Sequence, residues 1–165
     1  MKSFDGLYDV IKRLRAKDGC PWDREQTHAS LKAPCMEEAA EVVCGINILE
    51  DTGNAGNLKE ELGDLLLQVM MHAVIAEEEG LFTIEDVIGC ITEKMIRRHP
   101  HVFGDVTVAD SGEVLKNWEE IKKTEKEGNL VDETAYLFAA FDEAEKLIDQ
   151  ARKRKEKKQG VRQEA

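Results

Sequence analysis

The stretch that decides the fold runs from Glu37 to Asp64 and reads EEAAEVVCGINILEDTGNAGNLKEELGD. Both halves have a helical composition. The intervening residues 52–57 are rich in Gly and Asn, which end one helix and begin the next. Because this turn is short, two helices are expected to pack antiparallel, the first over about 30–51 and the second over about 57–79. The sequence therefore predicts a helical hairpin at the centre of the molecule.

The rest of the chain also favours helices. Hydrophobic residues make up 42% of the sequence and aromatic residues only 5%, which is more typical of an all-α protein than of a sandwich or barrel. Thr83 and Asp86 resemble a capping box that opens a further helix. Outside the hairpin, helices are predicted over about 4–16, 83–98, 110–128 and 132–158, with loops at 18–23 and 99–109.

The overall charge limits the partners. The chain has 34 acidic and 23 basic residues, a net charge of −11, which argues against nonspecific nucleic-acid binding. No apolar run approaches the roughly 18 residues that a membrane span needs, and the N-terminus lacks the apolar stretch of a signal peptide. We therefore expect a cytoplasmic protein with neither nucleic acid nor membrane as partner. A polyanionic small molecule could still bind if metal ions neutralise the contact.

Two segments are expected along the chain. Residues 1–128 form the main domain, and residues 129–165 form a helical extension with a basic tail. Residues 152–158 hold six basic residues and one acidic residue. One interpretation is a solvated helix end that the helix dipole favours, and the other is an intersubunit contact with the acidic body.

Paired carboxylates are the most informative feature of the hairpin. Glu38 and Glu41, and likewise Glu61 and Asp64, lie three residues apart on one helical face and within apolar surroundings. Across the seam the two pairs would repel, and a divalent cation would remove that conflict. Ligands that are all oxygen suit Mg²⁺ or Mn²⁺, whereas a di-iron bundle would use Glu-x-x-His pairs that are absent here. The alternative is an ordinary solvated acidic face. Gly63 suggests close approach of a neighbouring helix or ligand.

Five segments together resemble the MazG family of nucleoside triphosphate pyrophosphohydrolases. They are GCPWD at 19–23, EEAAE at 37–41, EELGD at 60–64, EKMIRRHPHVFGD at 93–105 and NWEEIK at 117–122. The resemblance covers residues 4 to about 126, and the single copy is similar to the N-terminal copy of tandem family members. It implies an all-α, dimeric enzyme that uses Mg²⁺ to cleave nucleoside triphosphates to monophosphate and pyrophosphate.

The resemblance also implies site residues. The metal-binding positions of the family are matched by Glu38, Glu41, Glu61 and Asp64. The substrate-site positions are matched by Asn57, Lys94, Arg98, Trp118 and Lys122, and some active relatives have a lysine where Asn57 stands. Lys94 and Arg98 share a helical face and could hold phosphate oxygens, or they could be ordinary solvated cations. Trp118 could stack on a base or fill the core.

These observations lead to one predicted function. We expect an all-α bundle that hydrolyses NTPs or dNTPs with Mg²⁺, or with Mn²⁺ as a substitute, as nucleotide-pool housekeeping. Glu37 or Glu60 would orient or deprotonate the attacking water, and the sequence does not choose between them. The alternative is a catalytically silent dimerising bundle or a regulatory module.

Self-association is expected as well. The helix over 30–51 carries Val43, Ile46 and Leu49 in an apolar stripe that the short first helix does not obviously cover. A homodimer or higher homo-oligomer would bury such a stripe and complete the bundle.

Overall fold

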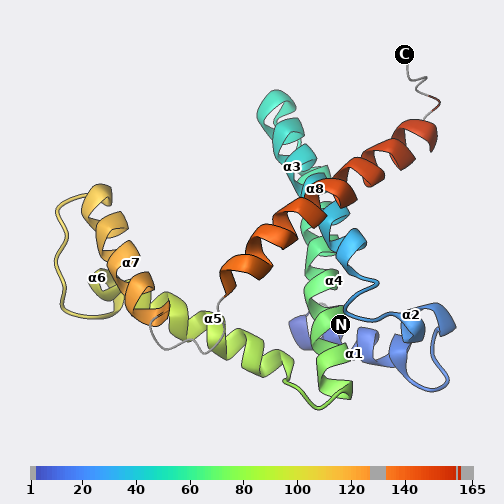
Figure 1. The fold of residues 1–165 in the computed structure, drawn as a ribbon, viewed down its shortest axis with the longest axis horizontal. Coiled ribbons are helices and arrows are strands. Elements are labelled where there is room, and N and C mark those ends of the chain that lie inside the picture. The colour runs from blue at the N-terminus through green and yellow to red at the C-terminus, as the bar shows by residue number, and fades with distance from the viewer. Residues whose placement is uncertain (1–2, 127–132, 159, 161–165) are drawn as a thin grey trace.

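In the computed structural model, which describes residues 3–126, 133–158 and 160, the chain consists of helices and connecting turns (Figure 1). The helices are α1 (Phe4–Arg15), α2 (Pro21–Glu25), α3 (Lys32–Thr52), α4 (Gly56–Glu78), α5 (Ile84–Arg98), α6 (Pro100–Phe103), α7 (Ser111–Lys126) and α8 (Glu133–Lys158). No strand occurs among the described residues, so the predicted all-α class is confirmed. None of the described helices is long and apolar enough to cross a membrane.

The predicted helices are present, but both predicted loops were wrong in part. Residues 18–23 include the start of α2, and residues 99–109 include α6. Each of these short helices begins at a proline, Pro21 or Pro100, because the fixed φ of proline suits the first helical position. The predicted helix end near Gly128 and the predicted start at residue 132 lie outside the described residues.

The α3–α4 hairpin is the centre of the molecule, and the two helices lie side by side (Figure 1). Gly53 ends α3 with φ of 72°, a left-handed conformation that glycine adopts without strain, and its N–H donates to the carbonyl of Leu49 at 2.8 Å. Closest packing occurs at Gly45, where an added Cβ would lie 2.7 Å from Leu58 Cα. The close approach of a neighbouring helix that was expected at Gly63 is wrong, since no atom of another helix lies within 4 Å of a Cβ built there.

The hydrophobic core lies at the other end of α4, where α1 packs against it. Ile11 of α1 and Met70 of α4 are fully buried, and Ile84 adds the first residue of α5. Burying a side chain of this size contributes roughly 1.5–3 kcal/mol to stability. This core fixes α4 and leaves its N-terminal half, with Glu61 and Asp64, free to line a site with α3.

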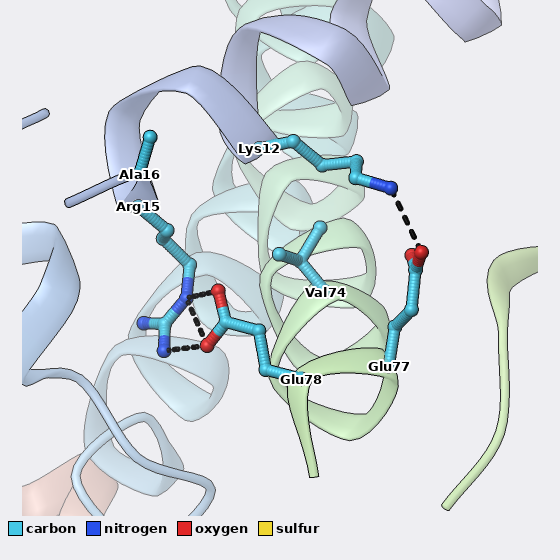
Figure 2. A pocket seen from close by; sticks show the side chains of 6 residues that line it. All are labelled: Lys12, Arg15, Ala16, Val74, Glu77 and Glu78. Atoms are coloured by element: carbon cyan, nitrogen blue, oxygen red, sulfur yellow. Dashed lines mark hydrogen bonds and ion pairs between the residues drawn. The ribbon is translucent and has the colours of Figure 1, made fainter. Parts of the chain in front are cut away.

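Ion pairs border this core. Figure 2 shows Arg15 of α1 against Glu78 of α4, with Nη2 2.6 Å from Oε2, and Lys12 against Glu77, with Nζ 2.8 Å from Oε1. The hydroxyl of Tyr8 also donates to Glu77 at 2.7 Å. Hydrogen bonds from Lys12 and Tyr8 lower the pKa of Glu77, so its carboxylate stays charged. The four charged side chains that line the pocket at this place are therefore paired with one another.

The remaining helices leave the hairpin in two directions. α5, α6 and α7 extend to one side, whereas α8 crosses α3 (Figure 1). Lys32 of α3 reaches Glu143 of α8 at 3.0 Å, and Ala151 of α8 is buried. α8 is thus packed on the hairpin.

Large apolar side chains stay uncovered in the single chain. Val43 is 56% exposed and Ile46 is 41% exposed on α3, as the sequence led us to expect, whereas Leu49 of the predicted stripe is partly buried. The first half of α8 is similar, with Tyr136, Leu137, Phe138 and Phe141 exposed. Exposed large apolar side chains in this number favour an interaction site.

The helix contact at Gly45 gives a first testable prediction. Gly45→Ala should lower the free energy of unfolding by about 1–3 kcal/mol, because its methyl group overlaps the backbone of Leu58. Gly63→Ala is the matched control: it adds the same methyl group in open space and should raise stability by up to about 1 kcal/mol. Urea denaturation followed by circular dichroism measures both. Equal effects of the two substitutions would contradict this packing.

Candidate metal centre

Three carboxylates converge where α3 faces the N-terminal half of α4. Glu38 of α3 and Glu61 and Asp64 of α4 each place one oxygen within 4.8 Å of the others. The spacing of three residues puts Glu61 and Asp64 on one face of α4, and the antiparallel hairpin brings Glu38 opposite them. The structure thus brings together three of the four ligands that the sequence predicted.

The three carboxylates repel one another at partly buried positions. Glu61 is only 8% exposed, and Glu38 and Asp64 are half-buried. Burial, together with the negative charges of Glu41, Asp64 and Glu61, raises the pKa of Glu38. Such a cluster is costly without a counter-ion. An all-oxygen donor set with this spacing fits a hard divalent cation such as Mg²⁺ or Mn²⁺.

Asn57 belongs to the same site. Its Nδ2 donates to Glu61 Oε1 at 2.9 Å, which orients that carboxylate. Its Oδ1 is buried and has no hydrogen-bond partner among the described residues. A buried polar atom without a partner is costly, so this oxygen is suited to accept from a ligand or a bound water.

The fourth predicted ligand, Glu41, is paired differently. Glu41 Oε1 accepts from Lys155 Nζ of α8, and Lys155 Nζ also lies 3.8 Å from Glu37 Oε1. Arg154 Nη2 lies 2.8 Å from Glu37 Oε2. Glu60, the other candidate base, is exposed on α4.

The basic tail therefore contacts α3 of its own chain. Most of the cations in 152–158 are exposed, as expected of a solvated helix end, but Arg154 and Lys155 also pair with carboxylates of their own chain, which neither interpretation included. The hydrogen bond to Glu41 raises the pKa of Lys155, so the side chain stays charged. The run of cations in 152–158 is evident in the sequence, but its contacts with α3 depend on the path of α8.

The predicted phosphate-binding cations lie elsewhere in the chain. Arg98 Nη2 is 2.5 Å from Glu125 Oε2, and its guanidinium lies 5.4 Å from the ring centroid of Trp118. The Arg98 hydrogen bond is the largest cause that lowers the pKa of Glu125 to about 2. Lys94 and Arg98 both lie on α5. Within the described part of the chain, α5 contacts α4, α6 and α7 but not α3.

Trp118 lies beside Arg98, and Lys122 is on the same helix, α7, as Trp118. Trp118 meets His99 edge-on, with ring centroids 5.0 Å apart, and Lys122 Nζ lies 3.2 Å from Glu119 Oε1. The structure thus divides the predicted site in two. Asn57 and the carboxylates lie on the α3–α4 hairpin, whereas the predicted substrate-site residues Lys94, Arg98, Trp118 and Lys122 lie on α5 and α7. Glu125 was missed because nothing local links it to Arg98, 27 residues earlier.

Comparison with known proteins agrees with the family resemblance of the sequence segments, among them EEAAE at 37–41 and EELGD at 60–64. Residues 26–103 match the family profile of the MazG nucleotide pyrophosphohydrolase domain. The chain is 46% identical over 151 residues to the nucleoside triphosphate pyrophosphohydrolase/pyrophosphatase MazG of Thermotoga maritima, covering 90% of this chain and 56% of that protein. It is 40% identical over 152 residues to the nucleoside triphosphate pyrophosphohydrolase of Escherichia coli, covering 89% and 56%.

A further relative is named only as uncharacterized. The protein YabN of Bacillus subtilis is 50% identical over 147 residues, covering 87% of this chain and 29% of that protein. The chain thus spans about half or less of the length of these curated relatives.

Metal binding by the cluster is directly testable. Glu61→Gln and Asp64→Asn should each weaken Mn²⁺ binding by more than about tenfold, because each removes a charged ligand at nearly constant volume. Glu50→Gln, an equal charge change at an exposed position of α3, is the control and should bind Mn²⁺ as the wild type does. Isothermal titration calorimetry measures the affinities. Unchanged Mn²⁺ affinity in both cluster variants would rule out this site.

Proposed function

Because the chain belongs to the MazG family, we propose that it hydrolyses nucleoside triphosphates, NTPs or dNTPs, to nucleoside monophosphate and pyrophosphate with Mg²⁺. The observation that carries the proposal is the convergence of Glu38, Glu61 and Asp64 at partly buried positions. Their charge and oxygen chemistry are suited to a divalent ion, and their helices carry two of the motifs by which the family resemblance was identified.

Each residue then has a role. Glu38, Glu61 and Asp64 would hold Mg²⁺ or Mn²⁺. When bound, the ion would neutralise phosphate charge and lower the pKa of a water bound to it. Asn57 keeps Glu61 oriented through its hydrogen bond. A carboxylate takes the proton of the attacking water, the water oxygen bonds to the α-phosphorus, and the bond to the leaving pyrophosphate breaks.

Two carboxylates are candidates for that proton. Glu37 lines a cavity beside the cluster together with Glu41 and Glu61, whereas Glu60 is exposed. Of the two, Glu37 is therefore the better placed to meet a water near the substrate. Its contact with Arg154 would also hold the carboxylate in a fixed orientation.

We further propose that the working unit is a homodimer or higher homo-oligomer. Exposed Val43, Ile46 and the aromatic residues of α8 leave apolar area that a second copy would cover. A second copy could also bring Lys94, Arg98, Trp118 and Lys122 to the carboxylates, which they do not reach within the described chain. Nucleotide-pool housekeeping in the cytoplasm would be the setting.

The reaction itself is tested by its products. Purified protein with Mg²⁺ and a panel of NTPs and dNTPs should release pyrophosphate and monophosphate, resolved by anion-exchange chromatography. Glu38→Gln should lower kcat/KM by more than about tenfold, whereas Glu50→Gln should not change it. Release of orthophosphate and diphosphate would show that the wrong bond had been assigned. If no nucleotide is turned over, the alternative is favoured, a catalytically silent dimerising or regulatory bundle. The pairing of Glu41 with Lys155 is also consistent with that alternative.

Assembly is tested separately. Sedimentation equilibrium at micromolar protein should give a mass of at least twice the 18.6 kDa of one chain. Val43→Glu should shift the population towards monomer, because it places a charge in the uncovered apolar stripe. A wild-type monomer with full activity would refute the assembly.

A further inference from the structure

A cavity of about 370 Å³ lies between α3, α4 and α8, directly beside the carboxylate cluster. One wall is acidic and is formed by Glu37, Glu41 and Glu61. The opposite wall belongs to α8 and carries Arg152 and Lys155. The volume lies within the range of small-molecule sites, and the two walls differ in charge.

The cations of this wall are held in place by a packed helix. Ala151 is buried against the hairpin, one turn before Lys155, and the pair of Lys32 with Glu143 attaches α8 to α3 further along. Lys155 bridges Glu41 and Glu37, while Arg152 lies 2.5 Å from Asp149 on its own helix. Because both cations end long, rotatable side chains, a change of partner requires rotation of the side chain while α8 stays packed.

A triphosphate at the cluster would need such cations. The charged side chains that line the α3 and α4 side of the cavity are all carboxylates, and these repel phosphate oxygens. Arg98, the cation expected to meet the phosphates, already forms a two-point ion pair with Glu125, and its guanidinium lies 5.4 Å from the ring centroid of Trp118. Among the described residues, the cations that line the cavity beside the carboxylates are therefore Arg152 and Lys155.

We propose that α8 completes the nucleotide site, with Lys155, assisted by Arg152, binding the phosphate chain of the substrate. Lys155 would exchange the carboxylate of Glu41 for a phosphate oxygen, so its charge stays paired throughout. Glu41, once released, would join Glu38, Glu61 and Asp64 as the fourth carboxylate. This inference rests on the proposed function and extends the substrate site beyond residues 1–128 and beyond the segment that matches the family profile.

The test compares two lysines on the same helix. Lys155→Met removes the charge and keeps the length of the side chain. Lys153→Met makes the same change at a residue that pairs with Asp149 and does not line the cavity. Isothermal titration calorimetry with inorganic tripolyphosphate in saturating Mg²⁺ should show about tenfold or greater weakening in Lys155→Met. Lys153→Met should match the wild type, and Lys155→Arg should recover most of the affinity.

The other outcomes are equally informative. Tripolyphosphate affinity that is unchanged or tighter in Lys155→Met would overturn the proposal. Tighter Mn²⁺ binding combined with undiminished tripolyphosphate binding would show instead that Lys155 only competes with metal for Glu41. Thermal unfolding monitored by circular dichroism establishes that each variant is folded.

Failure of this proposal can be distinguished from failure of the proposed reaction. If the wild type hydrolyses nucleoside triphosphates but Lys155→Met leaves KM and tripolyphosphate affinity unchanged, only the role of α8 fails. If the wild type hydrolyses no nucleotide and yet binds tripolyphosphate through Lys155, the reaction fails and the binding role of α8 stands.

Discussion

The close packing of α3 on α4, where Gly45 meets the backbone of Leu58, is the contact on which the site depends. Two helices that approach this closely bring Glu38 opposite Glu61 and Asp64. The repulsion among these carboxylates opposes folding, as the raised pKa of Glu38 indicates. Core packing at the other end of α4 offsets that repulsion, so the fold holds a cluster of negative charge that a cation would relieve.

Charge also explains where α8 lies. The chain carries a net charge of −11, but its C-terminal helix ends in a run of cations. In the structure this helix crosses α3, and Arg154 and Lys155 meet Glu37 and Glu41. The ion pairs are partly exposed, and their contribution to stability is therefore modest. Their more important consequence is positional, because they place positive charge within reach of an anion bound at the carboxylates.

Most features with a local signal were predicted from the sequence. The turn at 52–57, the capping box of Thr83 and Asp86 and the three-residue spacing of the carboxylates all depend on neighbours along one helix, and the structure contains them all. The prolines at 21 and 100 were interpreted as loop residues, although proline is also favoured at the first position of a helix.

Features that depend on contacts between residues far apart in the sequence could not be predicted from the sequence. Gly45 and Gly63 look alike in sequence, and only the rotation of each helix decides which of them faces a neighbour. Arg98 was expected to face phosphate, but its pairing with Glu125 depends on how α5 meets α7. The contact of Lys155 with Glu41 joins residues 114 positions apart.

The central claim is that the carboxylates of the hairpin form a divalent-cation site. Anomalous diffraction from crystals soaked in Mn²⁺ tests it most directly, because the signal locates the ion without reference to activity. The account predicts an anomalous peak about 2.0–2.2 Å from carboxylate oxygens of Glu38, Glu61 and Asp64. A peak at other residues, or none at this cluster in saturating Mn²⁺, would contradict it.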